Sequence, residues 1–287
     1  MEYVTSSILS KTFPKKDLWA HKGHYGRLLV IAGSEMMTGS PILVGKAALR
    51  AGADLVFMTG PKRAMEVAAH TSPTFITKPL NCSYLDRSFI RDIVDFAQEM
   101  RVTGLAIGPG LWKSRDTREA IMQLIEIFDI PMVVDADAIR ASSDLHKKKL
   151  EGKNIVFTPH ADEFRELTGE TVVNEVNFRA QVVAREAKAI NHVILLKGHA
   201  DIISDGKRTA VNKTGNVYMT KGGFGDTLTG ICAALMSRQK NQVDSFTAAC
   251  AAAYINGRAG DIATKSFRSG ILPTDLIDAI PRVISRG

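Results

Sequence analysis

Short apolar runs that end in glycine or a polar residue recur along this chain, and they constrain its fold more than any other feature. Runs that are apolar at nearly every position are typical of strands buried on both faces. Six such runs cover residues 27–34, 53–60, 104–110, 131–138, 154–160 and 192–199. Amphipathic helical stretches separate most of them, at 40–53, 114–128 and 177–190. This alternation predicts an α/β fold with a mostly parallel central sheet and helices on both faces.

Two other patterns complete the expected architecture. In the first predicted helix, Ser40 is the expected N-cap and Pro41 the first helical residue. Residues 201–216 contain Asp205-Gly206 and Gly215 as turn signals, which predict a small antiparallel flap after the last parallel strands. We expect a single domain over residues 1–287, because the chain shows no linker or repeat.

Composition argues against several functional classes. The formal charge is +7, but the basic residues are scattered, so no nucleic-acid partner is expected; the densest cluster, 146–149, is expected at a solvated helix end. The three cysteines form no CxxC pair, which fits a reducing cytoplasm. The chain shows neither a signal peptide nor an apolar run of membrane-spanning length, so we expect a cytoplasmic protein without a membrane partner.

The predicted site lies beyond the carboxyl ends of the strands, where open parallel sheets bind ligands. Small or polar residues stand there in every predicted core strand: Gly33-Ser34, 108–110, Asp135 and Asp137, 158–160, and 197–199. Known motifs fit poorly. Residues 39–47 have the wrong spacing for a P-loop, residues 222–230 lack the third glycine of a dinucleotide fingerprint, and no Cys/His spacing predicts a protein-bound metal.

The stretch "GGFGD" at 222–226 opens a predicted helix and allows two interpretations. Gly222, Gly223 and Gly225 can turn successive backbone N–H groups inward as an anion site, to which the helix adds its positive end. Asp226 would then accept a hydroxyl proton during phosphoryl transfer. The alternative is that Asp226 is only an N-cap after a flexible turn. Three glycines and a carboxylate beside an anion site favour the first interpretation.

The same stretch resembles the anion-hole and catalytic-aspartate motif of the ribokinase-like superfamily. Further blocks resemble the ADP- or ATP-dependent NAD(P)H-hydrate dehydratases in the family's order; they are "HKGHYGRLLVIAGSEMMTGSPILVGKAALRAGADLV", "IGPGL", "VVDADAI", "TPHADEF", "LLKGHADII" and "GGFGDTLTGICAAL". The resemblance covers nearly the whole chain. It implies repair of hydrated NADH and NADPH, in which ADP or ATP phosphorylates the hydrate's hydroxyl and phosphate then leaves. It also implies Mg²⁺ as cofactor and a homotetramer.

The resemblance assigns roles to individual residues. The hydrate (NADHX or NADPHX) would contact Ser40, Gly110, His160 and Asp226, with Asp226 as the catalytic base. The remaining residues fall into two groups: the adenine nucleotide would contact Lys197, Gly198, His199, Ala200, Asp201 and Gly225, and the anion hole would comprise Gly222, Gly223, Phe224 and Gly225. Each has a structural alternative, such as a turn glycine at 110 or a loop histidine at 160.

The sequence departs from the family pattern at several places. Ser40 replaces the usual alanine, Lys221 replaces a small residue, and Asp201 replaces the usual threonine. Ala161-Asp162 stand where the common Thr-Pro-His-Pro-Gly-Glu has Pro-Gly. Both nucleotides and both hydrates therefore remain candidates. We expect no companion epimerase domain in this chain. Two alternatives stay open: a small-molecule kinase of the same superfamily, acting on a thiazole or pyrimidine alcohol, and a non-catalytic nucleotide-binding regulator.

Overall fold

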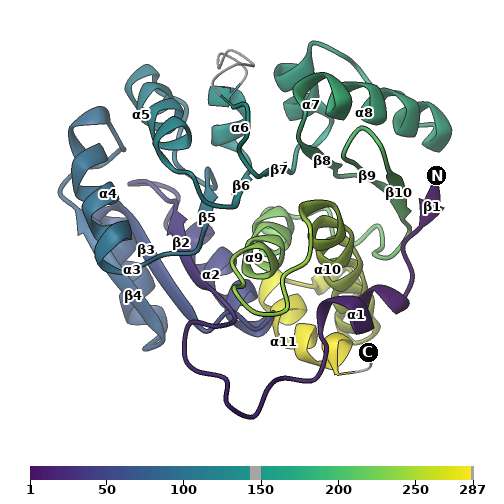
Figure 1. Cartoon of the computed structure of the whole chain (residues 1–287), viewed down its shortest axis with the longest axis horizontal. Coiled ribbons are helices and arrows are strands. Elements are labelled where there is room, and N and C mark those ends of the chain that lie inside the picture. The colour runs from purple at the N-terminus through teal and green to yellow at the C-terminus, as the bar shows by residue number, and fades with distance from the viewer. Residues whose placement is uncertain (143–149, 286–287) are drawn as a thin grey trace.

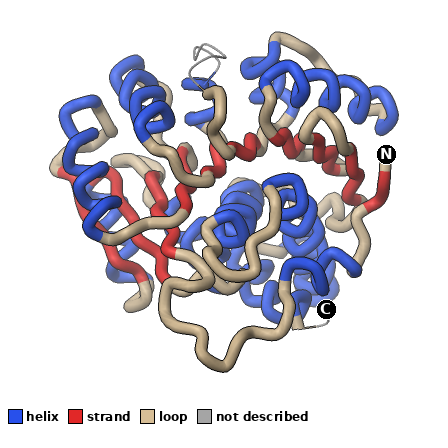
Figure 2. The backbone as a smooth tube through the Cα atoms, viewed as in Figure 1, coloured by secondary structure: helices blue, strands red, loops and turns tan. Residues whose placement is uncertain are grey.

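The computed structural model describes residues 1–142 and 150–285, and its central feature is a sheet of ten strands. The strands lie in the order β1-β10-β9-β8-β7-β6-β5-β2-β3-β4. Their bounds are β1 (Glu2–Tyr3), β2 (Arg27–Ile31), β3 (Leu55–Pro61), β4 (Phe75–Leu80), β5 (Gly104–Ile107), β6 (Met132–Val134), β7 (Ile155–Phe157), β8 (Val193–Leu196), β9 (Asp201–Ser204) and β10 (Thr209–Asn212). Figure 2 shows this sheet between two layers of helices.

All six predicted strands are present, and β2 to β8 pair in parallel. The predicted flap is also confirmed as a hairpin of β9 and β10. It does not lie apart from the sheet, because β9 pairs antiparallel with β8 and so extends it. The lysine-rich run at 146–149 lies outside the described residues.

Helices cover both faces of the sheet, as predicted (Figure 1). One face carries α1 (Ser7–Thr12), α2 (Gly39–Arg50), α3 (Lys62–Thr71), α9 (Phe224–Met236), α10 (Ser245–Phe267) and α11 (Pro273–Ile284). The other carries α4 (Ile90–Glu99), α5 (Arg115–Ile127), α6 (Asp137–Ser142), α7 (Ala161–Thr168) and α8 (Val176–Ile190). Short 3₁₀ turns lie at η1 (Arg87–Phe89) and η3 (Arg268–Gly270).

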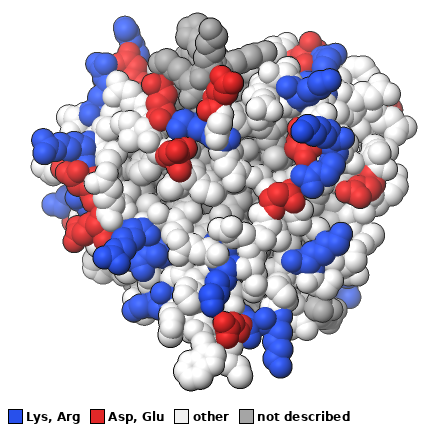
Figure 3. Space-filling model, in the orientation of Figure 1, with Lys and Arg blue, Asp and Glu red and all other residues white. Residues whose placement is uncertain are grey.

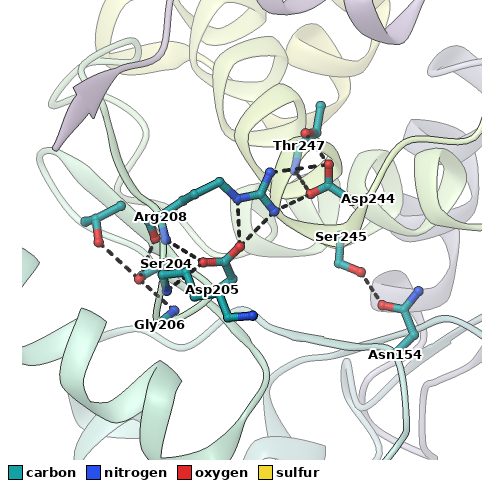
Figure 4. A network of polar contacts seen from close by, with 10 residues as sticks. Asn154, Ser204, Asp205, Gly206, Arg208, Asp244, Ser245 and Thr247 are labelled. Carbon is teal, nitrogen blue, oxygen red and sulfur yellow. Dashed lines mark hydrogen bonds and ion pairs between the residues drawn. The ribbon is translucent and has the colours of Figure 1, made fainter.

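The β9–β10 hairpin is tied to the start of α10 by the guanidinium of Arg208 (Figure 4). This group donates to Asp205 at 2.8 Å and to Asp244 at 2.7 Å. Asp244 is also the N-cap of α10 and accepts from the backbone N–H of Thr247. The Arg208 guanidinium further stacks on the ring of Phe246, 4.3 Å from its centroid. The hairpin is therefore held against α10, whose Asn256 and Gly257 line the cavity described below.

The start of α2 differs from the prediction. Its N-cap is Thr38, so Ser40 is the second helical residue and Pro41 the third. The Ser40 side chain is buried and is free to serve another partner than its own helix end. Proline is tolerated there because the N–H groups of the first turn have no intrahelical acceptor.

Candidate active site

The first turn of α9 places Asp226 inside the helix and not at its cap. Gly223 is the N-cap with φ +101°, a left-handed conformation that glycine adopts at little cost. Phe224, Gly225 and Asp226 are then the first three helical residues. The N-cap interpretation of Asp226 is therefore wrong. The expectation that Gly225 bends the chain is also wrong, because Gly225 is helical; it leaves space instead, since a Cβ atom there would lie 3.4 Å from Lys197 Nζ.

The carboxylate of Asp226 lies among charged groups from several strand ends. It accepts a hydrogen bond from the Ser40 hydroxyl of α2. Burial, together with the negative charge of Asp135, raises the pKa of Asp226 to about 7, although the Ser40 hydrogen bond and the Lys197 ammonium oppose this shift. A carboxyl group with a pKa near 7 can accept a proton at neutral pH and release it again.

Lys197, directly after β8, forms ion pairs with two carboxylates. Its Nζ lies 2.8 Å from Asp135 Oδ1 and 3.7 Å from Glu163 Oε2. Burial alone would lower the pKa of Lys197, but Asp135 and Glu163 outweigh it and the pKa is raised. Asp135 is held in turn by the Thr229 hydroxyl of α9 at 2.6 Å. Lys197 is therefore a fixed cation beside Asp226.

His160 caps α7 and is locked by Glu163. Its Nδ1 accepts from the backbone N–H groups of Asp162 and Glu163, at 3.1 and 3.4 Å. Glu163 completes the capping box by accepting from the His160 N–H at 2.8 Å, and its other oxygen lies 3.3 Å from His160 Nε2. Because Nδ1 is an acceptor, the neutral ring carries its proton on Nε2. The ring is about half exposed.

Gly110 lies beside Ser40 and Met37 at the edge of the site. Its φ is +70°, and a Cβ atom there would lie 3.1 Å from Ser40 Oγ and 2.9 Å from Met37 Cβ. A side chain at this position would displace the hydroxyl that bonds Asp226. Ser40, Gly110 and Asp226, three of the four predicted substrate contacts, thus meet at one place.

A cavity of about 440 Å³ is lined by His160, Lys197 and Gly225. The predicted nucleotide residues Gly198, His199 and Asp201 line it, and so does Phe224. Ala200 does not, because it is buried against α8. Gly222 and Gly223 also lie outside the cavity wall.

Asp201 fixes the part of the cavity wall that residues 197–201 form. Its carboxylate accepts from the Gly198 N–H at 3.1 Å and from the Asn212 amide at 3.0 Å. Burial raises the pKa of Asp201 to about 6. The backbone carbonyl of Lys197 accepts from Arg179 at 3.1 Å, so both ends of the 197–201 turn are fixed.

Sequence reasoning missed part of the site. The cavity wall also includes residues 214–217, Met219, Thr220 and the Asn256-Gly257 pair of α10, and the sequence assigns neither group to a ligand. The sequence predicts only a turn at Gly215 and only a closely packed helix at α10. Asp135 had been placed at a strand end without a role, and Glu163 had not been singled out; the strand-end position was the only available signal.

Comparison with known proteins identifies the family. The family model for NAD(P)H-hydrate dehydratase matches residues 28–282, which is most of the chain.

The chain belongs to the NAD(P)H-hydrate dehydratase family.

Two curated members of this family align over nearly the whole of this chain. The ADP-dependent (S)-NAD(P)H-hydrate dehydratase of Cenarchaeum symbiosum is 36% identical over 96% of this chain and 93% of its own. The bifunctional NAD(P)H-hydrate repair enzyme of Pyrobaculum aerophilum is 41% identical over 92% of this chain. The chain spans about half the length of that relative and of similar bifunctional relatives, 50–53%.

Solved structures agree with this assignment. The ADP/ATP-dependent NAD(P)H-hydrate dehydratase of Bacillus subtilis, co-crystallised with ATP and Mg²⁺, superposes with a TM-score of 0.85 at 27% identity over 99% of this chain and 98% of its own. The hydroxyethylthiazole kinase of Pyrococcus horikoshii shares the fold, with a TM-score of 0.65 at 15% identity over 98% of this chain and 95% of its own. The ribokinase-like α/β fold predicted from the sequence is therefore confirmed.

Two further observations bear on cofactor and location. In residues 1–142 and 150–285, no group of three His, Cys, Asp or Glu side chains is arranged to hold a metal ion. The same residues include no helix long and apolar enough to cross a bilayer. Acidic and basic side chains are interspersed on the face seen in Figure 3.

Proposed function

We propose that this protein is an ADP- or ATP-dependent (S)-NAD(P)H-hydrate dehydratase. The observation that carries the proposal is the placement of Asp226, a half-buried carboxylate with a pKa of about 7, bonded to Ser40 and directly following Gly225 of the cavity wall. Phosphoryl transfer needs a base at the attacking hydroxyl and fixed positive charge at the phosphates. Asp226 supplies the base, and Lys197 with the first N–H groups of α9 supplies the charge.

In the proposed reaction, the nucleotide occupies the cavity lined by residues 197–201 and Gly225, and the hydrate lies against Ser40, Gly110 and His160. Asp226 takes the proton of the hydrate's hydroxyl as that oxygen forms a bond to the terminal phosphorus. The bond from that phosphorus to the remaining nucleotide breaks, which releases AMP from ADP or ADP from ATP. Phosphate then leaves with the electron pair of its carbon–oxygen bond. The neighbouring ring carbon loses a proton, which restores the ring double bond.

Mg²⁺, the tetramer and the cytoplasmic location belong to the same proposal. Mg²⁺ commonly binds proteins through one or two carboxylates together with substrate phosphates and water. The described residues fit that mode of binding, because they offer no group of three His, Cys, Asp or Glu side chains that could hold the ion by protein ligands alone. When bound, the ion would neutralise phosphate charge. The tetramer rests on family resemblance, and a mass measurement by light scattering tests it; the cytoplasmic location rests on the three free cysteines.

The test is regeneration of dihydronicotinamide absorbance from purified NADHX or NADPHX, with ADP or ATP and Mg²⁺. We expect recovery only when nucleotide and hydrate are both present. A kinase of the same superfamily would phosphorylate an added thiazole or pyrimidine alcohol and leave the hydrates unchanged. The regulator hypothesis required Asp226 to be a mere cap, and the cap is Gly223; nucleotide binding without any turnover would nevertheless restore that hypothesis.

A further inference from the structure

A second cavity, of about 300 Å³, lies near the carboxyl ends of β5, β6 and β7 and plays no part in the reaction as described. It is lined by three cations and two carboxylates: Lys113, Arg118, Arg140, Asp137 and Glu166. Arg140 and Glu166 pair with each other, Nε to Oε2 at 2.8 Å. In Figure 3, side chains of both signs lie over α5 and α6.

The two chain segments that line this cavity both begin next to residues of the reaction site. Gly110 contacts Ser40, and three residues further on the chain reaches Lys113. Three residues span at most about 10 Å, so Lys113 lies one short segment from the hydroxyl that bonds Asp226. On the other wall, Asp137 follows Asp135, the partner of Lys197, by two residues.

The segment between Gly110 and Lys113 is strained. Trp112 has φ +78°, a conformation that costs a bulky residue about 1–3 kcal/mol and is kept only when the surroundings impose it. Two contacts hold it: its N–H donates to Asp137 Oδ2 at 2.9 Å, and its ring lies 5.9 Å from that of Tyr84. This fixed turn brings Lys113 to the cavity wall.

The positive charge of Lys113 is available to a ligand. It is exposed and donates no hydrogen bond to any residue within 1–142 or 150–285, although its charge acts on Asp137. The Arg140–Glu166 pair is explained as an ordinary surface ion pair. Lys113, a cation held on a strained turn beside the reaction site, is not explained in that way. An anionic group of the substrate would complete this cavity.

We propose that this cavity binds a phosphate group of the hydrated dinucleotide, with Lys113 as its main contact and Asp137 as the residue that positions the Trp112 turn. The inference rests on the proposed function, since it concerns the distal part of that substrate. The phosphate is either the pyrophosphate bridge, which both hydrates contain, or the 2′-phosphate, which only NADPHX contains.

The experiment compares KM and kcat for NADHX and NADPHX at saturating ADP in two variants of opposite effect. Lys113→Met removes a charged contact and should raise KM about fivefold or more with little change in kcat. Asp137→Asn keeps an acceptor for the Trp112 N–H and removes a negative charge, so it should lower KM. Arg115→Met is the matched control: its side chain is 90% exposed, it follows Lys113 by two residues at the start of α5, and it does not line this cavity.

Each outcome decides something. A rise for both hydrates in Lys113→Met supports the pyrophosphate, and a rise for NADPHX alone supports the 2′-phosphate. Unchanged KM values for both hydrates, or a change as large in Arg115→Met, overturn the inference. Absence of turnover by the unmodified protein would instead overturn the proposed function, so the two failures are distinguishable.

Discussion

At the scale of single residues, the proposal depends on one proton. Asp226 must be deprotonated to accept it, so kcat/KM should rise with pH through about 7, the pKa that burial and Asp135 impose. Asparagine at this position cannot take the proton. It keeps a side chain of the same size and leaves the Gly223 cap untouched.

We therefore expect Asp226→Asn to lower turnover of NADHX by roughly 10²–10⁴-fold. The melting temperature and the affinity for ADP should stay close to those of the unmodified protein, because Lys197 and the backbone hold the phosphates. The measurements are dihydronicotinamide absorbance at saturating ADP, a thermal melt and calorimetric titration with ADP. An enzyme within a few-fold of the original rate would remove Asp226 from the mechanism.

At the scale of elements, the start of α9 shows why the chemistry of a stretch was easier to predict than its geometry. The "GGFGD" pattern indicated an anion site with an aspartate, and the structure brings that aspartate to Ser40 and Lys197. The sequence could not say which glycine takes the left-handed conformation, because neighbours from α2 and β8 decide where the helix begins. The alternative interpretation placed the cap at Asp226, and the cap lies at Gly223.

The helical position of Gly225 leads to a prediction about a side chain at this place. In Gly225→Val, the side chain would meet Lys197 Nζ and fill part of the nucleotide cavity. Valine is no worse than glycine inside a helix, so the free energy of unfolding should change by less than about 1 kcal/mol. We expect a large loss of ADP affinity and turnover. Gly270→Val is the control, because a Cβ atom there meets open space; equal losses in both variants would refute the steric argument.

The start of β8 carries a second element-scale prediction, on stability. His192 is buried, and burial lowers its pKa to about 4. The unfolded chain binds this proton below about 6.5 and the folded chain only near 4, so folding weakens as pH falls through this window. The loss approaches about 3 kcal/mol.

The test is urea unfolding of the protein and of His192→Gln at several pH values. Glutamine can still donate to the Leu150 carbonyl that His192 bonds. The variant should lose less stability between pH 6.5 and 4. Asp201 and Asp226, whose pKa values are raised, act in the opposite direction in both proteins, so the difference between the two profiles isolates His192. Parallel profiles would show that His192 does not titrate in this way.

At the scale of the whole molecule, the core of the sheet was predictable and its edges were not. Runs such as 27–34 are apolar throughout because both faces are covered, which is what pattern reasoning detects. The edge strand β4 contains Lys78 and Pro79, and β1 has two residues, so neither carries that pattern. We propose that the described residues act as one domain, because the single sheet runs through them all.

The nucleotide cavity is likewise a property of the whole molecule, since segments far apart in the chain form it: the turn at 197–201, the loop at 214–220, the start of α9 and Asn256-Gly257 of α10. A ligand that contacts all of them should stabilise them together. At a hundredfold excess over its Kd, ADP should add about 2.7 kcal/mol to the free energy of unfolding. We expect slower amide hydrogen exchange in those four segments and unchanged exchange in α4, which lies near the far edge of the sheet. Protection centred on α4 and β4 instead would place the nucleotide elsewhere and remove the basis for the proposed reaction.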